Sequence, residues 1–288
     1  MSVQRVTKAD RIFKFLIMLV LALFCLIIIY PIIWIVSSSF SDAYAVMAGK
    51  VTLLPVDFTT RMYKLVFNNS EIWTSYLNTI EYTLLGVLVS VFLTSMCAYP
   101  LSRTDFFGKG FFTTVLMITM FFQGGMIPTF LLVQQLHLLD TVWAIVLPTA
   151  MSVYNTIVMR TFYLSTIPKE LEDAAWLDGA NDIQFYVLVV VPLSKAIMAV
   201  MVLFYGVEAW NSWLPAFLYM SSREKYPLQL ILREIIIQGT SSNAGDNELI
   251  GDGLKYATMV VTALPIMCLY PFLQKYFTKG VMIGSVKG

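Results

Sequence analysis

Residues 169–192 read KELEDAAWLDGANDIQFYVLVVVP, an acidic stretch followed by an apolar one. The five carboxylates belong to Glu170, Glu172, Asp173, Asp178 and Asp182. Small residues, Ala174, Ala175 and Gly179, stand among them. Where such a segment lies depends on the chain around it.

That chain is strongly apolar, with 58% hydrophobic residues, 13% charged residues and a mean hydropathy of +0.74. A soluble globular domain carries about 25% charged residues. The composition therefore predicts an integral membrane protein in contact with lipid. The net charge of +1 gives no reason to expect a nucleic-acid partner.

Six charge-poor stretches are long enough to span a membrane, because a charge at the bilayer centre costs about 2.5–3.5 kcal/mol. They cover residues 15–36, 73–101, 111–134, 141–160, 196–220 and 256–274. The first follows basic residues but is too long for a signal peptide, so we expect a retained helix. The fold class predicted is all-α: a polytopic membrane protein with about six transmembrane helices over residues 15–278.

The acidic stretch cannot be a seventh span. Positions 183–194 provide only 12 uncharged residues, too few for a helix to cross a core of about 30 Å. We therefore expect residues 165–192 to form a loop on the membrane surface.

Lys and Arg residues indicate which surface this is, since they are more abundant on the cytoplasmic side. With the N-terminus inside, 12 of the 19 fall on the cytoplasmic side: Arg5, Lys8, Arg11, Lys14, Arg103, Lys109, Arg160, Lys169, Lys195, Lys275, Lys279 and Lys287. The loop, the N-terminus (1–14) and the C-terminal tail (279–288) are then cytoplasmic. The glycine-, serine- and asparagine-containing segment 239–253 lies in the last outer loop.

Two short helices are predicted within the loop. Ser165 or Thr166 caps the first, with Pro168 in its first turn, and Gly179 ends it in a left-handed conformation. Asn181 or Asp182 caps the second, which runs toward Pro192. Apolar side chains of the second helix then anchor it to the spanning helices: Ile183, Phe185, Tyr186, Leu188 and the valines up to Val191.

The first helix presents a smooth surface rimmed by carboxylates. Glu170, Ala174 and Asp178 share one face by four-residue spacing, and Ala175 lies beside them. Such a surface suits close approach by a protein. The alternative is an interfacial helix that only connects two spans. Carboxylates facing an anionic inner leaflet argue against that alternative.

The same stretch resembles the EAA loop of ABC importer permeases. That pattern is EAA, three residues, Gly, nine residues and then I-x-L-P, and all its intervals are kept here, from Asp173 through Gly179 to Pro192. Asp replaces Glu at 173, and valines replace both Ile and Leu. The segments IPTFLLVQQLHLLDT (127–141) and WNSWLPAFLY (210–219) are similar to the MalG-like carbohydrate permeases, and the ending KYFTKGVMIGSVKG (275–288) resembles their LplC/YtcP-like branch.

The resemblance implies the transmembrane domain of a type I ABC importer in a bacterial cell membrane, and an oligosaccharide as substrate. It also implies three kinds of partner: a MalF-like second permease, two ATPase subunits and an extracellular solute-binding protein. The residues that it assigns to ATPase coupling are Glu170, Glu172, Asp173, Ala174, Ala175, Leu177, Asp178, Gly179 and Pro192.

We expect a transport subunit and not an enzyme. The sequence has no G-x-x-x-x-G-K-[ST] phosphate loop, so ATP and Mg²⁺ would be used by the partner ATPase and no cofactor is expected here. No metal site is expected either, because His137 is the only histidine and Cys25, Cys97 and Cys268 are widely separated.

Polar and aromatic residues within the predicted spans are candidates for a substrate path. They are Asn78, Glu81, Gln123, Glu208, Trp210, Asn211 and Trp213. Amides and carboxylates beside aromatic faces suit a sugar. Alternatively, Trp210 and Trp213 belong to an interfacial aromatic belt, and Glu208 pairs with another helix.

Three other functions fit part of the sequence. Glu81 and Glu208 would serve as ion sites in a secondary transporter. A membrane scaffold needs no transport at all, although it gives no reason for the EAA spacing. An ABC importer permease for a solute other than a sugar would share the loop.

Overall fold

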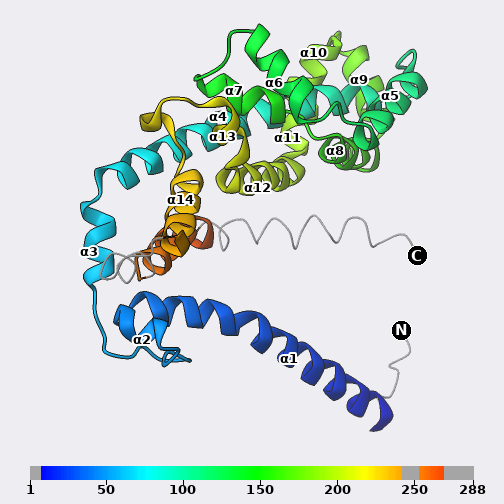
Figure 1. The fold of residues 1–288 in the computed structure, drawn as a ribbon. Helices are drawn as coiled ribbons and strands as arrows, with labels where there is room; N and C mark the ends of the chain where they lie inside the picture. Colours follow the sequence, from blue (N-terminus) through cyan, green and yellow to red (C-terminus); the bar gives the residue numbers. More distant parts are fainter. Residues whose placement is uncertain (1–7, 242–252, 269–288) are drawn as a thin grey trace. The chain divides into compact units, whose positions relative to one another are not determined.

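The computed structural model describes residues 8–241 and 253–268. This part of the chain is helical and contains no strand, so the all-α prediction is confirmed (Figure 1). The α-helices are α1 (Lys8–Ser39), α2 (Ala43–Met47), α3 (Arg61–Asn68), α4 (Ser70–Ser102), α5 (Lys109–Phe121), α6 (Met126–Gln135), α7 (Val142–Val146), α8 (Val153–Thr166), α9 (Lys169–Leu177), α10 (Asp182–Phe185), α11 (Val191–Leu193), α12 (Lys195–Asn211), α13 (Leu214–Tyr219) and α14 (Leu228–Ser241). Shorter elements are the 3-10 helices η1 (Leu147–Thr149) and η3 (Arg223–Lys225) and the π-helix η2 (Tyr186–Val190). A further apolar helix covers Gly253–Cys268.

The chain divides into two compact units. The first contains residues 8–70 and the described parts of 232–263. In it, the C-terminal end of α1 is tied to the following loop: the Trp34 indole donates to the Val51 carbonyl (3.1 Å), and the Ser37 hydroxyl donates to that of Leu53 (2.7 Å). The Trp34 ring also meets Tyr256 edge-on.

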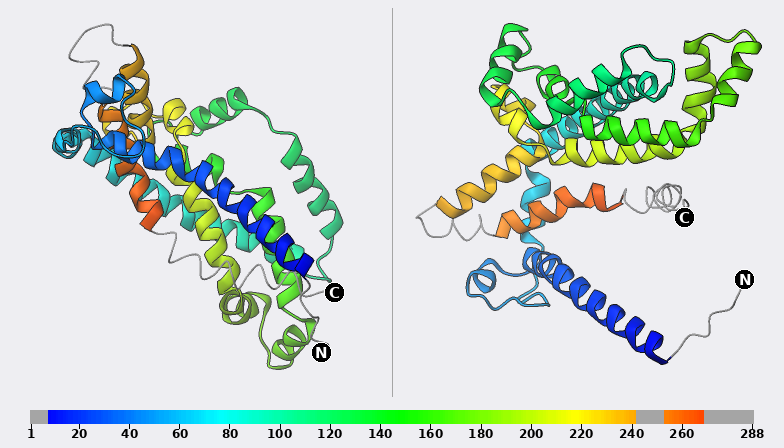
Figure 2. Two further views of the ribbon diagram at one scale, coloured as in Figure 1. Left: turned by 90° about the horizontal axis from the view of Figure 1, so that it is seen from below. Right: turned by 90° about the vertical axis from the view of Figure 1, so that its right-hand side faces the viewer.

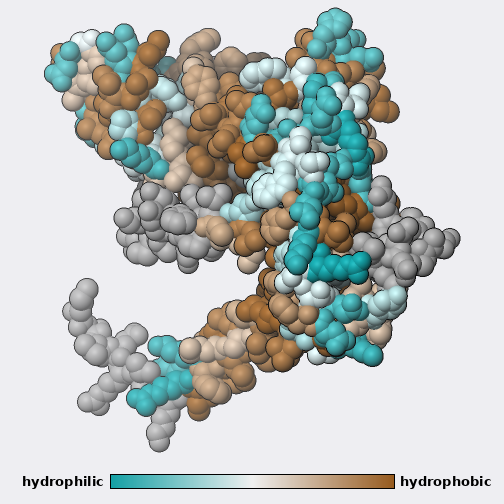
Figure 3. All heavy atoms as spheres, turned by 90° about the vertical axis from the view of Figure 1, so that its left-hand side faces the viewer, coloured by the Kyte–Doolittle hydropathy of each residue, from teal (hydrophilic) through white to brown (hydrophobic). Residues whose placement is uncertain are grey.

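Most of α1 exposes apolar side chains, from Ile12 to Val36 (Figure 3). A helix that is hydrophobic all round is stable only in a core or a membrane. The most apolar 18-residue window within its stretch Asp10–Ser39 has a mean hydropathy of 3.1, and the structure therefore agrees with a membrane environment for α1.

The second unit contains residues 71–231 and the described part of 264–288, and it is built around α4, α8 and α12, which lie side by side (Figure 2). Its core holds apolar residues with less than a tenth of their surface exposed, including Ala98, Met159 and Met201. Paired hydroxyls join the helices: Ser95 of α4 bonds Tyr163 of α8 (2.7 Å), and Thr94 bonds Tyr205 of α12 (2.6 Å). Such pairing satisfies polar groups that lipid cannot.

Several predicted spans are broken or bent. α5 and α6 meet at 112°, α7 and η1 meet α8 at 56°, and the predicted span 196–220 is interrupted between α12 and α13. Among the described residues, only α1 and α4 are long and apolar enough to cross a membrane as unbroken helices. If each bent helix pair counts as one span, the described residues contain up to five spans. The six-span model stays a prediction. The described residues do not include 1–7, 242–252 and 269–288. Most of the segment 239–253 and the whole predicted C-terminal tail (279–288) therefore lie outside them.

Candidate functional site

Helix α9 begins differently from the sequence prediction. Ser165 and Thr166 do not cap it, because they lie in the last turn of α8, where the Ser165 hydroxyl donates to the Phe162 carbonyl (3.0 Å). Pro168 stands at the N-cap position in an extended conformation. A proline disfavours helical geometry in the residue before it, and Ile167 accordingly separates the two helices with φ −112° and ψ 95°.

The predicted end of α9 at Gly179 is confirmed. Gly179 has φ +81°, the left-handed conformation that favours glycine. Its N–H donates to the Trp176 carbonyl (3.0 Å), and the Ala180 N–H donates to the Ala175 carbonyl (2.9 Å). These two bonds form a Schellman motif, which satisfies the last carbonyls of the helix and turns the chain sharply.

Asn181 caps the next helix, as predicted. Its side chain accepts from the Gln184 N–H, and the Gln184 side chain accepts from the Asn181 N–H, both at 2.9 Å. The predicted anchor is formed by part of the apolar set: Phe185 and Val190 are buried in the core, whereas Ile183 and Leu188 are exposed. Pro192, at the end of the loop, is also exposed.

Helix α9 has two different faces. The outer face exposes carboxylates and a small residue, together with Leu177, which is 89% exposed: Glu170, Asp173, Ala174, Leu177 and Asp178. The inner face carries Glu172, only 3% exposed, and Ala175, which packs against the core. Ala175 therefore does not belong to the outer surface on which the sequence analysis placed it, and Glu172, which the resemblance assigned to ATPase coupling, is not on that surface either.

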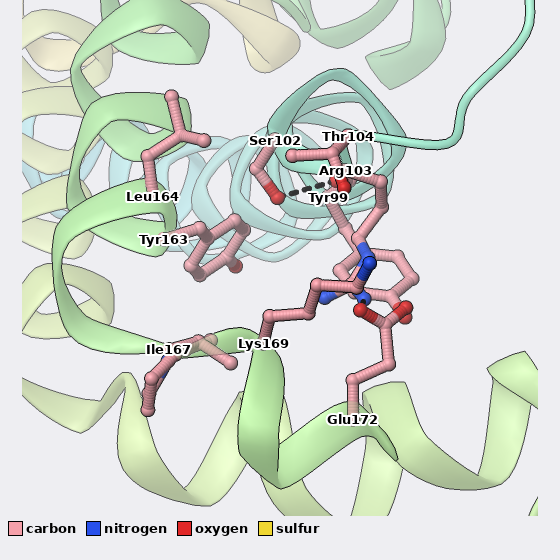
Figure 4. A pocket seen from close by; sticks show the side chains of 10 residues that line it. Tyr99, Ser102, Arg103, Thr104, Tyr163, Leu164, Ile167, Lys169 and Glu172 are labelled. Atoms are coloured by element: carbon pink, nitrogen blue, oxygen red, sulfur yellow. Dashed lines mark hydrogen bonds and ion pairs between the residues drawn. The ribbon is translucent and has the colours of Figure 1, made fainter. Parts of the chain in front are cut away.

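Glu172 forms an ion pair with Arg103, the residue that follows α4. Figure 4 shows the Glu172 carboxylate pointing from α9 toward the end of α4, beside a cavity of about 200 Å³ that Tyr163 and Lys169 also line. The Arg103 guanidinium lies over the rings of Tyr99 (5.7 Å) and Phe185 (5.6 Å). Sequence reasoning used Arg103 only to orient the chain and missed this pairing.

A larger open cavity, of about 880 Å³, lies at the helix breaks of the second unit. The turn between α5 and α6, the junction of η1 with α8 and the start of α13 all contribute to its wall. Gly125, with φ +88°, forms part of the first of these breaks. Two predicted path residues, Gln123 and Glu208, are brought together here with Tyr154, Tyr219 and the hydroxyls of Thr119, Thr129, Thr149 and Ser152.

The other predicted path residues lie outside the lining of this cavity. The Asn78 amide donates to the carbonyls of Glu224 (2.7 Å) and Tyr226 (3.2 Å), so it holds a loop. Trp210 is buried, and its ring centroid lies 5.8 Å from that of Tyr76. The Asn211 amide donates to the Val207 carbonyl (2.8 Å), and the ring centroids of Trp213 and Phe217 lie 6.2 Å apart. Glu81 is exposed on α4.

Asp140 ties two loops next to this cavity. Its carboxylate accepts from the N–H groups of Ser221 and Ser222 (both 3.0 Å), the Ser222 hydroxyl (2.7 Å) and the Lys225 ammonium (2.7 Å). Its own N–H donates to the carbonyl of Tyr219, a cavity residue (2.9 Å). The hydrogen bonds from Lys225 and then Ser222 hold the pKa of Asp140 well below the ordinary value. The sequence analysis quoted Asp140 only within the segment 127–141 and assigned it no role.

Known proteins resemble the chain over nearly its whole length. Residues 86–283 match the family described as binding-protein-dependent transport system inner membrane component. The polygalacturonan/rhamnogalacturonan transport system permease protein YtcP of Bacillus subtilis is 40% identical over 286 residues, covering 97% of this chain and 99% of YtcP. The LplC protein of the same organism is 38% identical and covers 98% and 97%.

A solved structure is also similar to this chain over nearly its whole length. It is a chain of a bacterial ABC transporter involved in the import of the acidic polysaccharide alginate, with a TM-score of 0.85 and 36% identity over 94% of this chain and 98% of that one. The resemblance to ABC importer permeases is thereby confirmed, as is the prediction of a membrane transport subunit rather than an enzyme. The chain belongs to the family of inner membrane components of binding-protein-dependent transport systems.

Proposed function

We propose that this chain is one of two permease subunits of an ATP-driven importer of oligosaccharides. Helix α9 would bind a cytoplasmic ATPase subunit, and the 880 Å³ cavity would form part of the wall of the sugar path. The observation that carries the proposal is the division of α9 into an exposed acidic face and an inner face held by a buried ion pair.

The outer face of α9 suits a protein partner. Ala174 keeps its centre small, while Glu170, Asp173 and Asp178 offer carboxylates to basic groups. Leu177 adds an apolar contact that is almost fully exposed in the isolated chain. A second protein that covers this face would remove the Leu177 side chain from water, which is favourable. Gly179 and Pro192 would act indirectly, by fixing where the loop turns and where it rejoins the bundle.

The cavity suits a sugar. Its amide, carboxylate and hydroxyl groups can exchange hydrogen bonds with sugar hydroxyls, and its aromatic side chains can cover C–H faces. The names of relatives support an oligosaccharide: polygalacturonan and rhamnogalacturonan for YtcP, arabinooligosaccharides for AraQ and maltodextrin for MdxG. A second, MalF-like permease would close the open side of the cavity.

The remaining parts of the importer follow from the same proposal. An extracellular solute-binding protein would deliver the sugar, and two ATPase subunits would use ATP and Mg²⁺. The chain would cross the cytoplasmic membrane several times with both termini inside. The orientation is supported by the distribution of Lys and Arg residues.

The substitution Ala174→Arg tests the docking surface. Ala174 is exposed, so the variant should fold and insert, but the long side chain should keep the ATPase away from α9. We expect ATPase that copurifies with a tagged permease to fall about tenfold or more, with a parallel loss of sugar uptake. The measurements are the ATPase-to-permease ratio after purification and uptake by cells.

The matched control is Ala48→Arg, the same change at an exposed alanine in a predicted outer loop. It should leave both measurements at the wild-type level. Normal copurification and uptake in Ala174→Arg would contradict the proposed role of α9.

A further inference from the structure

Glu172 is an unusual carboxylate for a docking helix. It lies one residue before Asp173, which is exposed, yet only 3% of its own surface is accessible. A buried carboxylate is costly unless an opposite charge and hydrogen bonds compensate it. Arg103 provides that charge from outside the loop, so the inner face of α9 is bound to the end of α4.

Arg103 is itself held in place. Its guanidinium is packed over Tyr99 of α4 and Phe185 of α10, and its carbonyl accepts from the Lys109 ammonium (2.8 Å). The neighbouring Leu101 carbonyl accepts from the Arg160 guanidinium of α8 (2.8 Å). A guanidinium fixed on two aromatic rings has little freedom to follow a moving carboxylate by itself.

The loop has a second connection to the same helix. The Tyr186 hydroxyl, in the π-helix after α10, bonds the Ser95 hydroxyl of α4 (2.6 Å). The Tyr186 ring also lies 5.0 Å from the Tyr99 ring. Both helical arms of the loop are therefore attached to the C-terminal half of α4, one by an ion pair and one by a hydrogen bond.

Helix α4 continues this set of contacts to the sugar cavity. Thr94 bonds the Tyr205 hydroxyl of α12 (2.6 Å), and that hydroxyl accepts from the N–H of Ser152 (3.1 Å). Ser152 lies in the cavity wall, at the start of α8. A displacement of α4 would thus change hydrogen bonds at the cavity itself.

We propose that Arg103 and Glu172 are a positioning pair that makes α4 move together with α9. The inference rests on the proposed docking of α9 to an ATPase. When the ATPase pulls on the exposed face of α9, the small side chain of Ala175, which packs on the core, offers little resistance to the displacement. Separating a buried ion pair leaves two uncompensated charges, so the pair transmits the pull instead.

The test removes both charges together, in the double variant Arg103→Gln/Glu172→Gln. Neither glutamine leaves an unpaired buried charge, so this variant should fold. The complete importer, with its ATPase and binding protein, is purified through a tag on this chain and reconstituted in liposomes. We expect normal ATPase copurification but about a tenfold fall in sugar transported per ATP hydrolysed.

Two further variants keep the result interpretable. Arg103→Lys retains the charge without the planar fork and should give an intermediate ratio of sugar to ATP. Asp105→Asn removes an exposed carboxylate two residues away and should behave as wild type. A purely structural role would lower the amount of complex or its melting temperature without changing sugar transported per ATP.

Two outcomes would overturn the inference. A wild-type ratio of sugar to ATP in the double variant would show that the pair transmits nothing. Loss of ATPase copurification would show that the pair serves docking instead. The proposed function is judged separately: it fails if the wild-type chain itself copurifies no ATPase or supports no ATP-driven uptake.

Discussion

The proposed coupling loop (165–192) and the proposed sugar cavity of about 880 Å³ are built in different ways. The loop is formed by one continuous segment, 165–192, whose turn and cap residues lie next to one another in sequence. The cavity is formed where three separate helix breaks meet, and each break contributes only a few residues to its wall. Local chemistry decides the first site, and packing between distant segments decides the second.

This difference predicts different sensitivities to substitution. In the loop, a single backbone conformation sets the direction of both helical arms, so one residue can disable it. In the cavity, many side chains would share the contact with a flexible sugar. There, one substitution should change affinity and leave the machinery intact.

Gly179→Val should have the largest effect. Nothing lies within 4 Å of an added Cβ, so the obstacle is the backbone: φ is +81°, where a β-branched residue costs about 1–2 kcal/mol. The Schellman motif should open and α9 should lose its angle to α10. We expect uptake to fall by about tenfold or more, measured with the ATPase-to-permease ratio.

Gly179→Asn is the matched variant, because asparagine tolerates the left-handed conformation. It should retain most of the uptake. Equal losses in the valine and asparagine variants would mean that the absence of a side chain, and not the backbone angle, is what the ATPase requires.

The end of α9 was predictable because its signals are local. A glycine at the end of an amphipathic stretch and an asparagine two residues later predict a helix, a turn and a second helix, and the structure has them. The predicted beginning of α9 was wrong because one local signal was chosen over another. Ser165 and Thr166 fit a cap by type, but α8 extends through them, and Pro168 was the local signal that places the break at Ile167.

Glu208→Gln tests the cavity and should have a moderate effect. Glu208 lines the cavity, and a charged hydrogen bond to a sugar hydroxyl would be weakened by the neutral amide. We expect the sugar concentration for half-maximal uptake to rise about five- to tenfold, with ATPase copurification unchanged. Uptake kinetics of reconstituted importer would measure this.

Glu81→Gln is the comparison variant. Glu81 has the same chemistry and was an equal candidate by sequence, but it is exposed on α4 outside the cavity lining. Its effect on half-maximal uptake should be smaller than that of Glu208→Gln. The same loss in both variants would contradict the cavity as the sugar path.

The partners of buried charges were out of reach of sequence reasoning. Glu172 and Asp173 are adjacent and chemically alike, yet one is buried against Arg103 and the other is exposed. Helical periodicity places them on different faces but does not say which face is covered. That depends on where α4 ends, and Arg103 is distant in sequence. For the same reason, the sequence could not tell which path candidates line the cavity. Gln123 and Glu208 do, whereas Asn78 holds a loop and Trp210 packs on an aromatic ring.

Asp140→Asn should have the smallest effect, and it tests whether the cavity depends on the loops beside it. Asp140 and Lys225 are partly exposed, at 28% and 40% of their side chains, so the pair contributes modestly. We expect the melting temperature at pH 7 to fall by about 2–4 °C. Asp57→Asn is the control, since Asp57 has the same left-handed backbone (φ 52° against 59°) and is exposed.

The pH dependence identifies the cause. Because the pKa of Asp140 is lowered in the folded protein, its stabilisation is present above the ordinary carboxyl pKa of about 4 and is lost as pH falls through the folded value. The difference in melting temperature between wild type and Asp140→Asn should therefore be largest near neutral pH and shrink below about pH 4. A difference that stays constant down to the most acidic pH at which both proteins remain folded would mean that the amide disturbs the loop by shape alone, and that the charge of Asp140 does not hold Ser222 and Lys225 beside the cavity.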